Sequence, residues 1–416
     1  MSKMFFSWNQ RSMLLLVALI AAMSLGCSPP VVEFRPAAGH QLAREAELEA
    51  QLGAEQKENI ATILDSLFGT PDQPHVPKVA EVDMGQLMNQ TAIEMAAGAV
   101  AVDEDGRPHG LYRQHCAHCH GITGDGMGPT AEFLNPYPRD YRMGKFKFKS
   151  TTTNARPTND DLHRLLKHGV PGTAMPSFRV LPQNQKDSLV QYVIYLSMRG
   201  ELERLLIGEL LGAGELGIEP PDGVLLNLSD KDTAEFQERS AWVQEKMTTI
   251  ANSWLQAQSE EVPPPPENWG SAESRQLGRD LFYGTRGGCV KCHGNIALGD
   301  GDNTFDLKTP LVDDWTKENW PKGLDAAGRL EREAVGILAE RPLRPRNLRQ
   351  GVYRGGRRPV DLYWRIRYGI SGTPMPAAKE LKSDEIWHLL DYVRSLPFES
   401  ISQPHEQLRN LKRERL

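Results

Sequence analysis

Apolar residues recur at helix spacing in several separate stretches of the chain, and each stretch predicts one amphipathic helix. The first, Gln41–Phe68, combines leucine and isoleucine at helix spacing with many Glu and Gln residues and ends at Gly69. The apolar stretch Thr91–Val102 predicts a second helix, but Gly106 and Pro108 interrupt the pattern soon after it. The chain therefore begins with helices that are separated by turn-forming residues.

The same order of helices is predicted twice. In the first copy, the helix Asp160–His168 precedes a longer helix, Gln183–Met198. In the second copy, Asp361–Tyr368 precedes a helix that Ser383 would cap and that carries an apolar face. A short helix, Ser274–Tyr283, comes before this second pair. The repeated order predicts two related helical regions.

A further amphipathic helix is predicted between the two copies, capped by Ser229 or Asp230. Its apolar face consists of Phe236, Val243, Met247, Ile250 and Trp254. The proline-rich run Val262–Pro266 then favours an extended spacer. Because an apolar helix face needs cover, we expect this one to pack against one of the flanking regions.

Each copy contains a C-x-x-C-H motif, the attachment signature of a c-type haem. The motif residues are Cys116, Cys119 and His120 in the first copy, and Cys289, Cys292 and His293 in the second. The two thiols of such a motif bond to the haem vinyl groups, and the adjacent histidine binds the iron. A structural zinc site with four thiolates is the alternative, but it does not explain the histidine after each pair. The sequence therefore predicts two haem c groups, each with its iron.

A methionine in a repeated phrase is the predicted sixth iron ligand in each copy. Met175 lies in Gly-Thr-Ala-Met-Pro and Met375 in Gly-Thr-Pro-Met-Pro, each after a predicted helix. Met127 lies too close to the first motif, and the remaining candidates occur in one copy only. They are Met143, His115, His118, His163, His168 and His388. The predicted axial pairs are His120 with Met175 and His293 with Met375.

A second correspondence lies between each motif and its methionine. Pro138-Arg139 and Pro345-Arg346 begin similar segments, with a constant offset (346 − 139 = 207). A proline carbonyl here would accept the Nδ1–H of the iron-binding histidine and fix its tautomer. Arg139 and Arg346 would each face a haem propionate, where a charge-assisted bond is favourable. The alternative is a plain turn with a solvated arginine.

Length and charge set outer bounds on the protein. At 416 residues we expect two or three domains, and a net charge of −6 gives no reason to expect a nucleic-acid partner. Of the five cysteines, four belong to the motifs and the fifth is Cys27. No pair remains for a disulfide.

Residues 1–27 read as an export signal, with Lys3 and Arg11 before the apolar run Met13–Leu25. The run is shorter than the roughly 20 residues that a membrane span needs. It ends in Met-Ser-Leu-Gly-Cys27, which resembles the lipobox of bacterial lipoproteins, although Ser24 stands where Leu is usual. That resemblance implies lipidation of Cys27. An ordinary signal with an incidental cysteine and an uncleaved anchor are the alternatives.

With these motifs the chain resembles a tandem class I cytochrome c of the kind found in bacterial respiratory chains. The resemblance covers residues 80–205 and 270–400 and implies an all-α fold, with two class I cytochrome c-like helical haem domains joined by a helical linker. The expected plan is a signal (1–27), a tether and spacer helix (28–79), a first cytochrome c domain (80–205), a helical and Pro-rich linker (206–269), a second cytochrome c domain (270–400) and a basic tail (401–416). The departures are the broken first helix and the long insertion Phe305–Arg344.

Two strong axial ligands leave no open iron position, so the resemblance implies one-electron transfer between respiratory-chain partners. These would be a quinol-oxidising complex, a terminal oxidase or another cytochrome, met at the periplasmic side of a bacterial membrane where a lipid anchor holds the protein. One alternative is a di-haem cytochrome c peroxidase, which needs one open haem. Another is the cytochrome subunit of a larger membrane oxidoreductase, bound through the 41–68 or the 231–257 helix.

Two surface features stay open between a structural and a functional interpretation. The 41–68 helix is either a spacer from the membrane or a partner-docking helix. The arginine-rich loop of the second copy either steers an acidic redox partner or is simply solvated. Its members are Arg341, Arg344, Arg346, Arg349, Arg354, Arg357 and Arg358.

Overall fold

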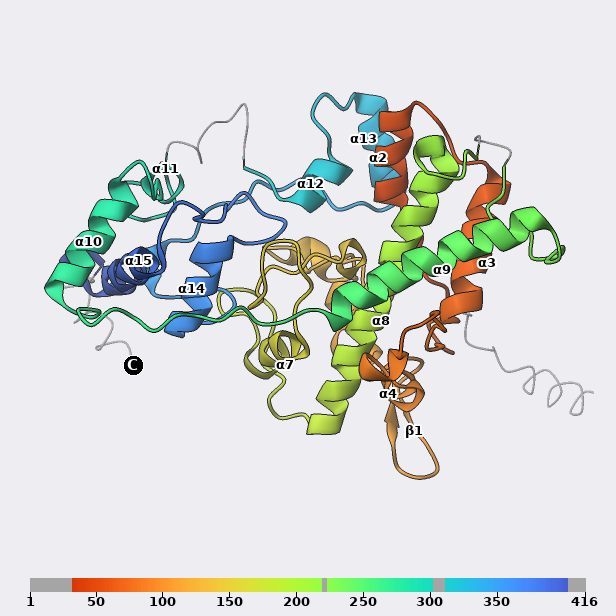
Figure 1. The fold of residues 1–416 in the computed structure, drawn as a ribbon, viewed down its shortest axis with the longest axis horizontal. Coiled ribbons are helices and arrows are strands. Elements are labelled where there is room, and N and C mark those ends of the chain that lie inside the picture. The colour runs from red at the N-terminus through yellow and green to blue at the C-terminus, as the bar shows by residue number, and fades with distance from the viewer. Residues whose placement is uncertain (1–31, 219–222, 302–310, 403–416) are drawn as a thin grey trace, which may run out of the picture. The chain divides into compact units, whose positions relative to one another are not determined.

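Helices make up most of the regular secondary structure in the computed structural model, which describes residues 32–218, 223–301 and 311–402 (Figure 1). The strands in those residues are β1 (Ala101–Val102) and β2 (Pro108–His109), which pair antiparallel with Ala101 opposite His109. The helix-rich composition agrees with the expected all-α class. Residues from Phe34 onward form one compact unit.

The first part of the chain, residues 34–261, we call the first half. Its helices are α2 (Ala38–Leu48), α3 (Ala54–Phe68), α4 (Gln90–Ala96), α5 (Leu111–His115), α6 (Ala117–His120), α7 (Asn159–His168), α8 (Gln183–Gly208) and α9 (Ala234–Leu255). Short 3-10 turns are η1 (Met84–Gln86), η2 (Ala131–Phe133) and η3 (Tyr141–Met143), and α8 continues into a π-helical turn, η4 (Glu209–Ala213).

Residues 262–402 form the second half. Its helices are α10 (Ala272–Tyr283), α11 (Val290–His293), α12 (Asp314–Asn319), α13 (Ala326–Ala334), α14 (Pro359–Tyr368) and α15 (Ser383–Ser395). The 3-10 turns are η6 (Leu348–Gln350), η7 (Leu396–Phe398) and η8 (Ser400–Ser402).

The buried apolar side chains fall into separate clusters. The largest joins α3, α4, α8 and α9 in the first half. A second joins α10, α14 and α15 in the second half, where Phe282, Tyr392 and Ile386 are fully buried or nearly so. Trp315, Trp320 and Ile337 make a small third cluster inside the insertion. Each C-x-x-C-H motif lies beside one of the two larger clusters.

The predicted N-terminal helix is two helices rather than one. Glu49 takes a left-handed conformation (φ +53°) and Gly53 an extended one, so the backbone turns between α2 and α3. The helix end at Gly69 is confirmed. Ile63, Leu64 and Phe68 are almost fully buried, and the Tyr195 hydroxyl of α8 donates to the Phe68 carbonyl at 2.6 Å. The apolar face of α3 is therefore core, which neither the spacer nor the docking interpretation foresaw.

The broken first helix of the first copy ends earlier than predicted. Helix α4 stops at Ala96, and β1 and β2 follow as a small hairpin up to His109. Asp103 holds this hairpin together by accepting bonds from the backbone N–H groups of Asp105 and Arg107. A new helix, α5, then leads into the first motif.

Most other helix predictions match the structure, with corrections at the ends. Helix α8 runs ten residues past the predicted end at Met198 (208 − 198 = 10). Thr233, rather than Ser229 or Asp230, caps α9 by accepting the N–H of Phe236 at 3.2 Å. Lys382 stands at the cap position of α15, with Ser383 as the first helical residue.

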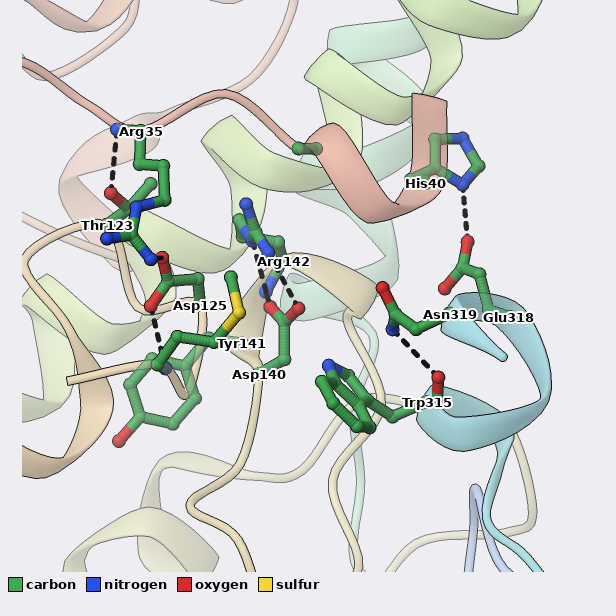
Figure 2. A network of polar contacts seen from close by, with 12 residues as sticks. Arg35, His40, Thr123, Asp125, Asp140, Tyr141, Arg142, Trp315, Glu318 and Asn319 are labelled. Atoms are coloured by element: carbon green, nitrogen blue, oxygen red, sulfur yellow. Dashed lines mark hydrogen bonds and ion pairs between the residues drawn. The ribbon is translucent and has the colours of Figure 1, made fainter. Parts of the chain in front are cut away.

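The insertion in the second half contacts the first half through α12. Glu318 of α12 accepts from Arg204 of α8 at 2.7 Å and lies 2.5 Å from Nδ1 of His40 in α2. Figure 2 shows the contact between His40 and Glu318 together with a second one, in which the backbone N–H of Arg35 donates to the Thr123 hydroxyl in the first motif's loop. These contacts tie residues 35–40 to α12 and to the loop after the first C-x-x-C-H motif.

Candidate haem sites

The two C-x-x-C-H motifs form the same short helical turn. Helix α6 starts directly after Cys116 and α11 directly after Cys289. The backbone N–H of His120 donates to the Cys116 carbonyl at 2.8 Å, and that of His293 to the Cys289 carbonyl at 2.9 Å. The turn places the second thiol and the histidine close to the first thiol, as two-point attachment of one ring requires.

Each motif histidine is oriented by a backbone carbonyl. Nδ1 of His120 lies 3.1 Å from the carbonyl oxygen of Arg139, and Nδ1 of His293 lies 3.2 Å from that of Arg346. Because a carbonyl can only accept, Nδ1 must be the protonated nitrogen in both rings. The lone pair is then on Nε2, which is the atom free to bind iron.

The acceptor differs by one residue from the sequence prediction. The carbonyls of Arg139 and Arg346 hold the histidines, whereas the prediction named the preceding prolines. The Pro138 carbonyl instead lies against Gly126, where an added Cβ would come within 2.7 Å of it. The same contact recurs between Pro345 and Gly299, at 2.2 Å. The proline carbonyls thus pack on the glycine-rich loop, and the chain turns the next carbonyl toward the histidine.

Burial favours the neutral form of both histidines. Desolvation lowers the pKa of His120 to about 4, against a raising contribution from its bond to the Arg139 carbonyl. Desolvation also lowers the pKa of His293. A neutral imidazole is the form that binds a metal.

The motif thiols are partly buried, and Cys116, Cys119 and Cys289 are free. Burial raises the pKa of the Cys116 thiol to about 12 and that of Cys289 to about 11. Sγ of Cys119 lies 3.3 Å from the Thr130 hydroxyl. The first motif therefore presents two free thiols, which are the groups that bond to haem vinyl groups.

The two methionine phrases have the same backbone geometry. In the first, the N–H of Val170 donates to the Met175 carbonyl at 3.1 Å, and the N–H of Met175 donates to the Thr173 hydroxyl at 3.2 Å. The second phrase repeats both bonds at 3.1 and 3.3 Å, through Ile370, Met375 and Thr373. Met175 and Met375 are both half-buried. Two sequences that differ at several positions thus hold their methionine in one shape.

Unpartnered cationic groups test whether a haem fits between motif and methionine. Nη2 of Arg139 and Nε of Arg354 are buried and have no hydrogen-bond partner among the described residues. Burial lowers the pKa of Arg139, with Asp313, Asp140 and Asp314 acting in the opposite direction. A haem brings two propionates, which are the anions that such groups lack. Free thiols, a free Nε2 and a half-buried methionine fit a haem in the first copy, and the second copy repeats the frame. The orphaned guanidinium nitrogens of Arg139 and Arg354 fit the propionates of bound haem.

Sequence reasoning missed a charged junction beside these sites. Lys145 donates to Asp314 at 2.7 Å and Lys147 to Asp313 at 3.2 Å, so the segment after η3 is tied to the start of α12. Burial, together with the nearby charge of Arg139, lowers the pKa of Lys147 to about 8. A signal existed, since Lys147 aligns with Arg354 at the same offset of 207 (354 − 147 = 207).

Two arginines of the second copy's loop make interactions within the chain. Arg341 donates to the carbonyls of Leu134 and Glu132 and lies over the Tyr137 ring at 4.0 Å. Arg349 pairs with Glu399 at 2.8 Å. These two side chains therefore have intramolecular partners, and steering of an acidic redox partner by the loop stays a prediction.

Two of the other histidines weighed as ligands, His163 and His388, have partners elsewhere. His163 lies 3.3 Å from Asp187, and Nδ1 of His388 lies 3.0 Å from the Ser274 hydroxyl. In the described part of the chain no three His, Cys, Asp or Glu side chains gather where they could hold a metal ion. Cys27 lies outside the described residues, as does most of the basic tail.

Comparisons with known proteins bear on the first copy. Residues 104–193 match the family model described as cytochrome c oxidase, cbb3-type, subunit III. This stretch is a cytochrome c domain. It contains Cys116, Cys119, His120, Arg139 and Met175, and its presence implies haem-based electron transfer.

Two further comparisons, with solved structures and with curated proteins, do not assign the chain to a family. A solved structure, the Kuenenia stuttgartiensis reducing HAO-like protein complex Kustc0457/Kustc0458, shares 26% identity with a TM-score of 0.46, covering 72% of this chain and 99% of that one. No curated protein matched the chain. None of the helices in the described ranges has the length and apolarity to cross a membrane.

Proposed function

We propose that the chain is a di-haem c-type cytochrome that relays single electrons between redox protein partners. The observation that carries the proposal is the duplicated frame. His120 with Arg139 and His293 with Arg346 make the same bond at 3.1 and 3.2 Å, and the two methionine phrases repeat their backbone bonds. A frame kept in both copies indicates that both hold the same group.

The residues that would hold the first haem are Cys116, Cys119, His120, Met175 and Arg139, and those for the second are Cys289, Cys292, His293, Met375 and Arg346. When bound, each haem supplies one iron that changes between the ferrous and ferric states, and a methionine ligand raises its potential. The carbonyl of each arginine fixes its histidine's tautomer. In each methionine loop a threonine hydroxyl accepts the methionine N–H, and the methionine side chain is half-buried.

Two axial protein ligands at each iron separate an electron carrier from a peroxidase. A di-haem peroxidase needs one iron with an open position, but this chain offers a methionine in the same backbone shape at both sites. We therefore propose a carrier and expect no peroxide turnover. Since the matched family model describes an oxidase subunit, a role as the cytochrome subunit of a membrane oxidoreductase is compatible with the same residues.

The remaining proposals concern place and partners. We propose export, lipidation at Cys27 and attachment to the periplasmic side of a bacterial membrane. Partners would be a quinol-oxidising complex, a terminal oxidase or another cytochrome.

A redox-titrated absorption spectrum of the holoprotein, recorded with and without peroxide, tests the proposed function. Two centres that both show the weak methionine–iron(III) band at the red end, with no peroxide turnover, support it. One high-spin centre or rapid peroxide consumption would mean that one methionine is not a ligand and that the protein is an enzyme.

A further inference from the structure

The arginine that orients each histidine reaches the methionine loop of the other copy. A Cβ placed on Gly372 would lie 3.6 Å from Nη1 of Arg139. A Cβ placed on Gly172 would lie 2.6 Å from Nη2 of Arg346. Gly172 and Gly372 each lie three residues before a methionine (175 − 172 = 3; 375 − 372 = 3). The contacts are therefore reciprocal.

Each arginine thus joins two sites through two different groups. The Arg139 carbonyl is bonded to His120 in the first copy, while its guanidinium lies against the Met375 loop of the second. Arg346 does the same in the opposite direction. We propose that the charges of Arg139 and Arg346 are shared between the two sites, so that each arginine sets the redox potential of both haems.

The surroundings keep these charges effective. Charge interactions strengthen where water is excluded, and Nη2 of Arg139 is buried without a partner in the described residues. The charged groups facing Arg139 are Asp140, Lys147, Asp313 and Asp314, while Arg346 faces Arg354. Asp140 is already bonded to Arg142 at 3.0 Å. Positive charge is therefore in excess between the two sites.

Segments at equivalent positions of the two copies lie close together beside Arg139 and Arg346. Lys147 and Arg354 align at the same offset, and each lies within electrostatic range of the other. The Phe148 ring packs on Gly355, where a Cβ would come within 2.4 Å. The Asp314 N–H donates to the Gly372 carbonyl at 3.1 Å, which ties α12 to the Met375 loop. The methionine loop of the second copy is thus bonded to the start of α12, which Lys145 and Lys147 tie to the first half.

The inference rests on the proposed function, because it needs both haems bound. A positive charge disfavours ferric iron relative to ferrous, so removing one lowers a potential. We expect Arg139→Gln to lower both midpoint potentials, Arg346→Gln to do likewise, and Arg139→Lys to restore most of the change. Asp313→Asn retains an oxygen that can cap α12 but removes a negative charge, and should raise both potentials.

The experiment is a spectroelectrochemical titration of holoprotein variants that retain two haems. Arg179→Gln is the matched control, because Arg179 lies four residues after Met175 but is exposed (179 − 175 = 4), so water screens its charge and neither potential should move. A shift confined to one haem in Arg139→Gln would overturn the shared role. Arg139→Lys behaving like Arg139→Gln would also overturn it, since geometry rather than charge would then matter.

The two failures can be told apart. If wild-type protein lacks two His/Met centres, the proposed function fails before any variant is compared. If wild type has both centres but each arginine shifts only its own copy's haem, the proposed function stands and this inference fails.

Discussion

Nδ1 of His120 donates to the carbonyl oxygen of Arg139 at 3.1 Å, and this bond joins the first attachment motif to a segment nineteen residues farther along (139 − 120 = 19). The second copy spans a longer gap, from His293 to Arg346 (346 − 293 = 53), and still makes the same bond at 3.2 Å. The insertion between them is therefore accommodated without moving the carbonyl. The ligand frame, rather than the loop around it, is what the two copies share.

If Met175 and Met375 are iron ligands, each substitution should affect one of the two haems. Met175→Ala and Met375→Ala should each remove roughly half of the methionine–iron(III) absorption and lower one midpoint potential, because a thioether favours ferrous iron. Met127→Ala is the control, since Met127 lies in the loop that follows the first motif and has no place in the frame. A loss of absorption in Met127→Ala, with none in Met175→Ala, would reassign the first ligand.

Gly169 supports the Met175 loop and should not tolerate a side chain. It has φ +64°, and an added Cβ would lie 2.7 Å from the Met175 carbonyl. Gly169→Ala should therefore cost about 1–3 kcal/mol in the free energy of unfolding and weaken the methionine–iron(III) band. Chemical denaturation followed by haem absorption and far-ultraviolet circular dichroism measures both effects.

Gly208→Ala is the matched control for that substitution. Gly208 lies in α8 with helical φ, and a Cβ there would meet nothing within 4 Å. Its replacement should stabilise by up to about 1 kcal/mol through helix propensity. Equal destabilisation by the two variants would show that the Met175 loop has no special requirement for glycine.

Glu318 should contribute stability that depends on pH. Burial would raise its pKa, but the bonds from His40 and Arg204 outweigh burial and lower the pKa to about 2. A lowered pKa means that stabilisation is complete above the unfolded value near 4.5 and is lost as the pH falls from there toward 2. The free energy of unfolding of the wild type should exceed that of Glu318→Gln by on the order of 2–3 kcal/mol at pH 7.

Urea unfolding at pH 7, 4 and 3 measures that difference. Glu333→Gln is the control, because Glu333 is exposed on α13 and its change should be small at every pH. A wild-type advantage over Glu318→Gln that stays constant down to pH 3 would contradict the ion-pair account.

Phe68 tests whether α3 belongs to the core. Its side chain is fully buried, so Phe68→Ala should cost about 3–5 kcal/mol. Phe133→Ala should change stability by less than about 0.5 kcal/mol, because that ring is 76% exposed. If both substitutions had similar, small effects on thermal unfolding, α3 would be a spacer helix and not part of the core.

The sequence predicts features that depend on residues lying close together in the chain. The helices α7, α9 and α14 depend on residues within a few turns of one another, and their predicted bounds agree with the structure to within a few residues. The attachment motifs and methionine phrases depend on equally short spacing, and their role as haem ligands stays a prediction. The pairing of Pro138-Arg139 with Pro345-Arg346 was also visible. Which carbonyl meets the histidine was not, because the packing of the proline on Gly126 decides it.

Long-range partners lay beyond the sequence. An apolar stripe on residues 54–68 shows that a face is buried but not that α8 buries it. Likewise Glu318 reads as one acidic residue in an insertion, and only the fold brings it to His40 and Arg204. The reciprocal contacts of Arg139 and Arg346 depend on how two copies pack, which no local pattern encodes.

The most direct test of the account is the number of haems bound covalently to one chain. Intact-mass measurement of the holoprotein should show two haem additions, and the double substitutions Cys116→Ser with Cys119→Ser, or Cys289→Ser with Cys292→Ser, should each leave one. A single haem addition to the wild-type chain would contradict two equivalent sites. So would a double substitution at either motif that leaves the number of haem additions unchanged.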